Sequence, residues 1–117
     1  MNIDTALYPN GIAVIRLAGQ IDPQIAATIK QRLLALIASG HARLVTDLAA
    51  VSFVNSAGLR VLVEGCKAAR LAGGDMRLAR PTDQARAVLR LTQLDQFILA
   101  YDSAEAAQAS FDERPEA

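Results

Sequence analysis

The sequence predicts an α/β domain, with a mostly parallel sheet of about five strands, one antiparallel edge strand and four helices. Two features of the chain lead to this fold class. The segment "YPNG" at 8–11 is a tight-turn signal between two β-prone segments, which is typical of a hairpin. After the hairpin, helical and strand-like patterns alternate to the end of the chain, which is typical of right-handed crossovers between parallel strands.

The two hairpin strands are predicted from their side-chain patterns. Ile3, Thr5 and Leu7 alternate along the first strand. The segment "IAVIRLAG" at 12–19 is a nearly continuous β-prone run, as expected of a strand that is buried on both faces. The second hairpin strand should therefore be central in the sheet.

A long helix and a third strand follow the hairpin. Asp22 is a good helix N-cap, and Pro23 suits the first helical position because its missing N–H needs no partner there. Apolar residues then recur on one face until Gly40 ends the helix. The segment "RLVTDLA" at 43–49 is predicted to be a short buried strand.

The second half of the chain continues the alternation. Helices are predicted at 57–72, 82–94 and 103–111, with strands at 75–80 and 97–101 between them. Either Asp102 or Ser103 should cap the last helix. No repeat or linker interrupts the pattern, so we expect a single domain over 1–112 and a disordered tail at 113–117.

Composition narrows the class of function. The chain of 117 residues has 12 basic and 12 acidic residues without a basic block, which makes nucleic acid a poor candidate for a partner. It has neither a long apolar run nor a secretory signal, so we expect no membrane association. The single cysteine, Cys66, cannot form an internal disulfide, which indicates the cytoplasm. We expect a monomer when no partner is bound.

Few side chains could carry catalysis, so the sequence indicates a protein that is not an enzyme and uses no cofactor or metal. His41, the only histidine, follows a helix-ending glycine and is expected to be a solvated turn residue. Cys66 lies on the apolar face of its helix, and nothing near it in sequence would activate the thiol. No cysteine and histidine residues have the spacing of metal ligands.

The segment "VSFVNSAGLRVLVEG" at 51–65 carries the main functional signal. Asn55 or Ser56 should cap a helix there, and because a strand precedes it, the cap should lie at the carboxyl edge of the sheet, where sites usually form. Ala57 and Gly58 put no bulk beside the Ser56 hydroxyl, which indicates that a partner approaches closely. At a helix N-terminus, the fold would tolerate a phosphate on Ser56.

The same helix has a polar face, on which Arg60 and Glu64 have i,i+4 spacing. Beside this face runs a strip of small residues outside the main apolar stripe: Val61, Gly65, Ala68 and Ala72. Two interpretations of the strip are open. It could contact a neighbouring helix of the same chain, or it could form a docking groove for a helix of a partner next to Ser56.

Three segments resemble the STAS domain family, and in particular the single-domain anti-sigma factor antagonists of bacteria. The segment "DLAAVSFVNSAGLRVLV" resembles the family signature, with matches in register at Asp47, Leu48, Val51, Phe53, Ser56, Gly58 and Leu59. The segment "LAGQIDPQIAATIKQRL" resembles a Gly-Glu-Leu-Asp segment of the family through Gly19 and Asp22. The segment "LTQLDQFILAYDSAEAA" resembles its C-terminal stretch, so the resemblance covers residues 3 to 112.

The resemblance implies a STAS fold and a switch controlled by phosphorylation. In such proteins, the unphosphorylated antagonist binds a serine-kinase anti-sigma factor and frees the sigma factor. Phosphorylation by the kinase ends the binding, and a PP2C-type phosphatase resets the switch. Ser56 aligns with the phosphoacceptor, and Asp22 with an acidic residue of the kinase-binding surface. The expected partner-binding residues are Asp22, Asn55, Ser56, Ala57, Gly58, Arg60, Val61 and Glu64.

Two residues depart from the family pattern, and two other functions stay open. Ala57 removes a second hydroxyl next to Ser56, which leaves Ser56 as the only local phosphoacceptor. Asn55 stands where the family commonly has aspartate, which preserves the helix cap but removes a negative charge that bears on kinase recognition. The first alternative is a STAS interaction module without phosphorylation, such as a stress-assembly scaffold or a lipid-transport ABC accessory subunit. The second is a STAS domain that binds a small ligand.

Overall fold

The computed structural model describes residues 2–112 and confirms the predicted fold class. In chain order, the elements are β1 (Asn2–Tyr8), β2 (Ile12–Gln20), α1 (Pro23–Ala38), β3 (Arg43–Phe53), α2 (Ser56–Leu71), β4 (Asp75–Ala79), α3 (Asp83–Leu91), the 3-10 helix η1 (Leu94–Gln96), β5 (Ala100–Tyr101) and α4 (Ala104–Ala109). The strands form one sheet in the order β1-β2-β3-β4-β5. Among the described strands, only β1 and β2 pair antiparallel, so β1 is the expected antiparallel edge strand.

The hairpin turn forms where the sequence predicts it. Tyr8 pairs with Ile12 across the turn, and between them Asn10 and Gly11 have positive φ angles of 67° and 72°. Glycine and asparagine adopt this left-handed conformation more readily than other residues, which explains why the turn forms at Asn10 and Gly11.

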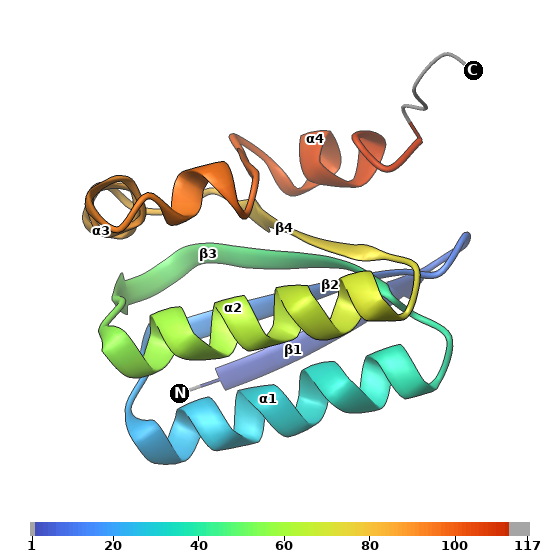
Figure 1. Ribbon diagram of the computed structural model, residues 1–117, viewed down its shortest axis with the longest axis horizontal. Coiled ribbons are helices and arrows are strands. Elements are labelled where there is room, and N and C mark those ends of the chain that lie inside the picture. Colours follow the sequence, from blue (N-terminus) through green and yellow to red (C-terminus); the bar gives the residue numbers. More distant parts are fainter. Residues whose placement is uncertain (1, 113–117) are drawn as a thin grey trace.

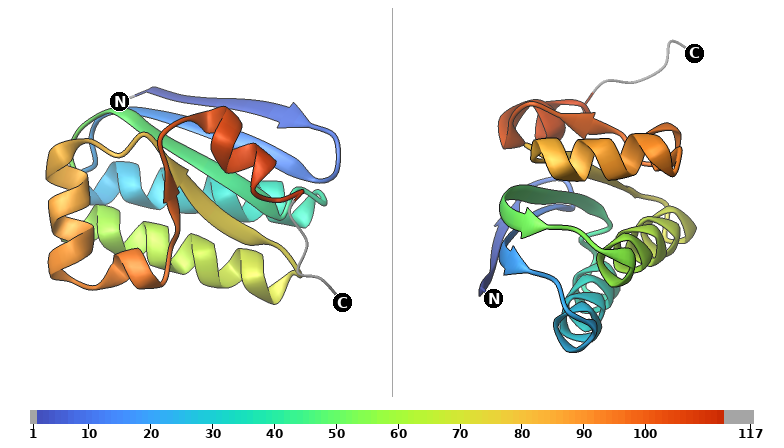
Figure 2. Two further views of the ribbon diagram at one scale, coloured as in Figure 1. Left: turned by 90° about the horizontal axis from the view of Figure 1, so that it is seen from above. Right: turned by 90° about the vertical axis from the view of Figure 1, so that its left-hand side faces the viewer.

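The sheet lies between two helical layers. Helices α1 and α2 cover one face, and α4 lies on the opposite face (Figure 1). Figure 2 shows α3 across the end of the sheet at which β3 ends. The main core lies between the sheet, α1 and α2, and includes the fully buried Ile15, Leu33 and Leu62. A smaller core beneath α4 contains Val14, Val45, Ala79, Ala104 and Ala107.

Every α-helix begins at a side chain that accepts a backbone N–H from the first turn. The four capping residues are Asp22, Asn55, Thr82 and Ser103. Ser103 rather than Asp102 therefore caps α4, and Pro23 occupies the first turn of α1 as predicted. These caps fix where each helix starts, and two of them belong to the candidate site.

Strand β3 is longer than the sequence indicates. It continues past residue 49 to Phe53, because its last residues still pair with the end of β2 through two shifts in register. Phe53 itself pairs with Gln20. As a result, β2 and β3 end together, immediately before α1 and α2.

The predicted boundaries near the C-terminus also differ. Helix α3 ends at Leu91 instead of residue 94, because Gln93 has a left-handed φ of 61°. Strand β5 has only two residues, because the backbone before it stays in a turn in which the Ile98 N–H donates to the Leu94 carbonyl at 2.8 Å. Helix α4 spans Ala104–Ala109, shorter than predicted. The tail predicted at 113–117 lies outside the described residues.

No helix within residues 2–112 has both the length and the apolar character needed to cross a membrane.

Candidate functional site

The N-termini of α1 and α2 lie side by side at the edge where the parallel strands β2 and β3 end (Figure 1). This is the carboxyl edge at which the sequence predicts a site. Asp22 caps α1, and its carboxylate accepts the N–H of Ile25 at 2.8 Å. The turn from Asn55 to Gly58 opens α2. The fold therefore brings Asp22 to the same edge as the Ser56 segment.

Asn55, and not Ser56, caps α2. The side-chain oxygen of Asn55 accepts the N–H of Gly58 at 3.0 Å, and its backbone carbonyl accepts the N–H of Leu59 at 2.9 Å. Ser56 is exposed, and no hydrogen bond among residues 2–112 uses its hydroxyl. Because the start of the helix does not depend on this hydroxyl, it is available to a partner.

A side chain from α3 holds the backbone just before Asn55. The Gln84 side-chain amide accepts the Val54 N–H at 2.9 Å and donates to the Val54 carbonyl at 3.0 Å. Both backbone groups of Val54 are thereby satisfied between the end of β3 and the start of α2. Sequence reasoning missed Gln84, because the contact joins residues 30 positions apart and leaves no local pattern.

Gly58 has an internal packing role that the sequence did not reveal. It is buried, and a Cβ there would lie 3.2 Å from Val54 Cγ1 and 3.3 Å from Ile21 Cδ1. Ile21 and Val54 directly precede the caps of α1 and α2. The absence of a side chain at Gly58 therefore lets the starts of α1 and α2 pack together, which is one reason for the small residue at this position.

Substitution of Gly58 by valine is expected to lower the free energy of unfolding by about 1–3 kcal/mol, the usual cost of overpacking. The added bulk would separate Ile21 from Val54. Urea denaturation measures the loss. Gly58→Ala is the graded control, because the better helix propensity of alanine, about 1 kcal/mol, offsets its tight contact. Equal stability of the valine variant and the wild type would contradict the packing role.

The strip of small residues on α2 is an internal contact in its first half. Val61 is only 2% exposed. Gly65 is buried, and a Cβ there would lie 2.7 Å from Leu33 Cδ1 on α1 and 2.6 Å from Met76 Cε on β4. Contact with a neighbouring helix of the same chain, the first of the two interpretations, therefore accounts for Val61 and Gly65.

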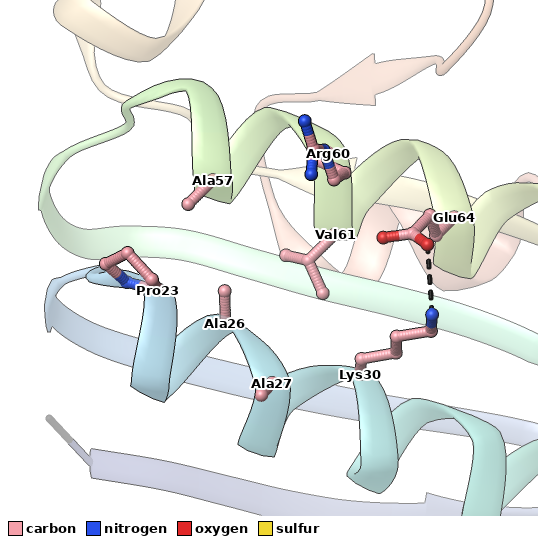
Figure 3. A pocket seen from close by; sticks show the side chains of 8 residues that line it. All are labelled: Pro23, Ala26, Ala27, Lys30, Ala57, Arg60, Val61 and Glu64. Carbon is pink, nitrogen blue, oxygen red and sulfur yellow. Dashed lines mark hydrogen bonds and ion pairs between the residues drawn. The ribbon is translucent and has the colours of Figure 1, made fainter.

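A shallow groove of about 220 Å³ remains between the first two turns of α1 and α2 (Figure 3). Its lining residues are Pro23, Ala26, Ala27 and Lys30 from α1, and Ala57, Arg60, Val61 and Glu64 from α2. Ala57 places one end of the groove beside Ser56. Because Ala57 directly follows Ser56 in the chain, the groove and Ser56 form one continuous surface. The four lining residues from α2 are all among the expected partner-binding residues.

An ion pair between Lys30 and Glu64 spans the far end of the groove, with 3.0 Å between Lys30 Nζ and Glu64 Oε2. The spacing on α2 favours a pair between Arg60 and Glu64, but Glu64 turns toward Lys30 instead (Figure 3). Among residues 2–112, no carboxylate oxygen lies within 4.0 Å of the Arg60 guanidinium. The groove therefore presents one paired cation and one cation that is available.

The remaining reactive side chains lie away from this edge. Cys66 is buried on the apolar face of α2, as predicted, and desolvation raises the pKa of its thiol. His41 is half-buried in the turn after α1, with its Nδ1 3.1 Å from Ser39 Oγ. In the described part of the chain, no three His, Cys, Asp or Glu side chains are placed to hold a metal ion.

The sequence is similar to a known protein family and to named proteins. Residues 5–107 match the model of the STAS domain. The anti-sigma-F factor antagonist RsfB of Mycobacterium tuberculosis is 40% identical over 53 residues, which cover 45% of this chain and 43% of RsfB. The match thus spans less than half the length of that relative. BtrV of Bordetella bronchiseptica is 28% identical over 102 residues, 87% of this chain and 88% of BtrV.

A solved structure shows the same architecture. The crystal structure of an anti-sigma factor antagonist from Mycobacterium paratuberculosis matches with a TM-score of 0.82 and 26% identity, over 96% of this chain and 96% of that chain. The similarity extends over all the elements that place the groove and Ser56.

Proposed function

This chain belongs to the STAS domain family, and from that premise we propose that it is an anti-sigma factor antagonist switched by phosphorylation of Ser56. The unphosphorylated form binds a serine-kinase anti-sigma factor and so frees the sigma factor. The kinase transfers the γ-phosphoryl group of ATP to Ser56 Oγ, with ADP as the leaving group and loss of the hydroxyl proton, and the complex dissociates. A PP2C-type phosphatase hydrolyses the phosphate and restores the binding form.

The spare hydroxyl of Ser56 is the observation that carries the proposal. Asn55 caps the helix, so a phosphate on Ser56 removes no hydrogen bond that the fold needs. The phosphate would also sit at the N-terminus of α2, where the helix dipole favours negative charge. Both arguments support a modification that changes what the surface binds while the fold remains.

The groove beside Ser56 supports the binding step. Asp22 and Arg60 are exposed, and Ala57 and Glu64 are half-buried, so their side chains are open to a partner. Val61 contributes as a buried lining residue of the groove. The name of RsfB favours an anti-sigma factor as the partner. The protein acts by binding and is not an enzyme.

Phosphopeptide mass spectrometry on the protein isolated from its native cells, with and without phosphatase treatment, tests the switch. We expect a phosphatase-sensitive phosphate on Ser56 and no phosphate at this site in Ser56→Ala. Because Asn55 supplies the cap, Ser56→Ala should keep the melting temperature of the wild type. Ser52→Ala removes another exposed serine of the same segment and should keep the phosphate.

An unmodified Ser56 under all growth and stress conditions would contradict the switch. It would favour the constitutive STAS module, such as a stress-assembly scaffold or a lipid-transport ABC accessory subunit. A small apolar ligand retained through purification would instead favour the ligand-binding STAS domain.

A further inference from the structure

We propose that Arg60 binds the phosphate of phosphorylated Ser56 and is thereby withdrawn from the partner-binding surface. This inference rests on the proposed function, because it concerns the phosphorylated state of the same site. It adds a second effect to the new negative charge: the phosphate also removes a positive charge that the unphosphorylated surface offers. The switch would then make the surface more negative at two neighbouring positions, because Ser56 gains negative charge and the positive charge of Arg60 is neutralised.

The spacing on α2 favours this pair. Arg60 follows Ser56 by four residues on one helix, so the two Cβ atoms are about 6 Å apart on the same face. Side chains on a helix lean toward its N-terminus, which brings the longer arginine back over the turn that contains Ser56. An acidic group four residues before a basic one is also the more stabilising order of the two.

Arg60 is the cation of this surface that is available for the phosphate. Lys30, the other cation of the groove, pairs with Glu64 at 3.0 Å. Figure 3 shows that Arg60 projects away from α1 while Glu64 turns toward Lys30. Within residues 2–112 the Arg60 guanidinium has no carboxylate partner within 4.0 Å, and the side chain is exposed. No existing ion pair must break before the phosphate binds.

The chemistry of the two groups is complementary. A guanidinium is planar and can donate two parallel N–H bonds to two phosphate oxygens, which an ammonium cannot do in the same geometry. Once held in this way, Arg60 can no longer pair with an acidic group of the anti-sigma factor. The groove would then present the Lys30–Glu64 ion pair and a neutralised Arg60.

The test uses the full chain with phosphoserine installed at position 56 during translation, so that no kinase is required. A ³¹P NMR titration gives the second pKa of the phosphate in the wild type, in Arg60→Gln and in Lys67→Gln. We expect the proton affinity of the phosphate to be at least threefold lower in the wild type than in Arg60→Gln. Lys67→Gln removes an exposed cation about two turns beyond Arg60 and should titrate like the wild type.

Other charged groups near Ser56 do not change the difference in phosphate pKa between the three proteins. Asp22 at the cap of α1 and the Lys30–Glu64 pair are present in all three proteins, so their effect on the phosphate cancels. Equal pKa values in the wild type and Arg60→Gln would overturn the inference. Because the phosphate is installed directly, that result would leave the proposed function standing, whereas absence of the phosphate in native cells would remove the function itself.

The melting temperature gives a second test of the interaction between Arg60 and the phosphate, without a titration. Phosphorylation should raise the melting temperature more in the wild type than in Arg60→Gln, since only the wild type gains the new ion pair. Arg60→Lys keeps the charge but not the paired N–H donors and should fall between them. An equal gain in the wild type and Arg60→Gln would also count against Arg60.

Discussion

Replacing Asp47 with alanine is expected to lower the free energy of unfolding by about 3 kcal/mol, because hydrogen bonds between charged groups in a protein contribute about 1.5–3 kcal/mol each. The Asp47 side chain is only 2% exposed. Its oxygens accept from Arg80 Nη2 at 2.6 Å and from the Ala49 N–H at 3.0 Å. The first contact ties the end of β4 to β3, the strand that leads to Ser56.

Chemical denaturation of matched variants measures this effect. Asp47→Asn keeps the volume and can still accept from Ala49, so it should lose less stability than Asp47→Ala. Asp102→Ala is the control, because Asp102 also pairs with an arginine, Arg86, at 3.0 Å but is 97% exposed. Exposed pairs of this kind contribute little. Similar losses for Asp47→Ala and Asp102→Ala would show that burial of the Asp47 pair is unimportant.

The family signature contains both residues that stabilise the fold and residues of the binding surface. The resemblance places Asp47 and Ser56 in one signature, but the structure gives them different roles: the first is buried in an ion pair, and the second is exposed with a spare hydroxyl. Gly58 belongs with Asp47, since its lack of a side chain serves internal packing. Position within a signature therefore does not distinguish residues of the fold from residues of the binding surface.

The parts of the fold that depend on local chemistry were predictable. Turn residues such as Asn10 and Gly11, caps such as Asp22, and the apolar periodicity of α1 and α2 act within a few residues. The alternation of strands and helices then predicted a mostly parallel sheet with one antiparallel edge strand, through the rule for parallel crossovers. The position of Ser56 at the carboxyl edge followed from the strand that precedes it in such a sheet.

The parts that depend on distant contacts were not predictable. Gln84 forms a hydrogen bond with Val54, 30 positions away in the sequence. Glu64 pairs with Lys30, 34 positions away, and not with Arg60 on its own helix. The extent of a strand such as β3 depends on its partner strand, which a local pattern does not reveal. Asn55 and Ser56 are both good caps, so only the extended backbone at Asn55, with φ −104° and ψ −171°, decides between them.

Phosphorylation of Ser56 is expected to weaken binding to the serine-kinase anti-sigma factor at least a hundredfold, which corresponds to about 2.7 kcal/mol. The phosphate adds a charge of about −1.5 to −2 at neutral pH and bulk beside the small Ala57. A charge without a partner in a desolvated interface is enough to account for such a loss. Titration calorimetry with the anti-sigma factor and the two forms of the protein measures the ratio of dissociation constants.

Three variants separate charge from loss of the hydroxyl. Ser56→Ala should bind as the unphosphorylated wild type does, because Asn55 keeps the helix start intact. Ser56→Glu should lose part of the affinity, since a carboxylate carries less charge and fewer acceptor oxygens than a phosphate. Ser52→Glu adds a charge at another exposed position on β3 and should change the affinity little. If Ser56→Ala also lost a hundredfold, the hydroxyl itself would be a binding contact, and dissociation would follow from its removal and not from the charge.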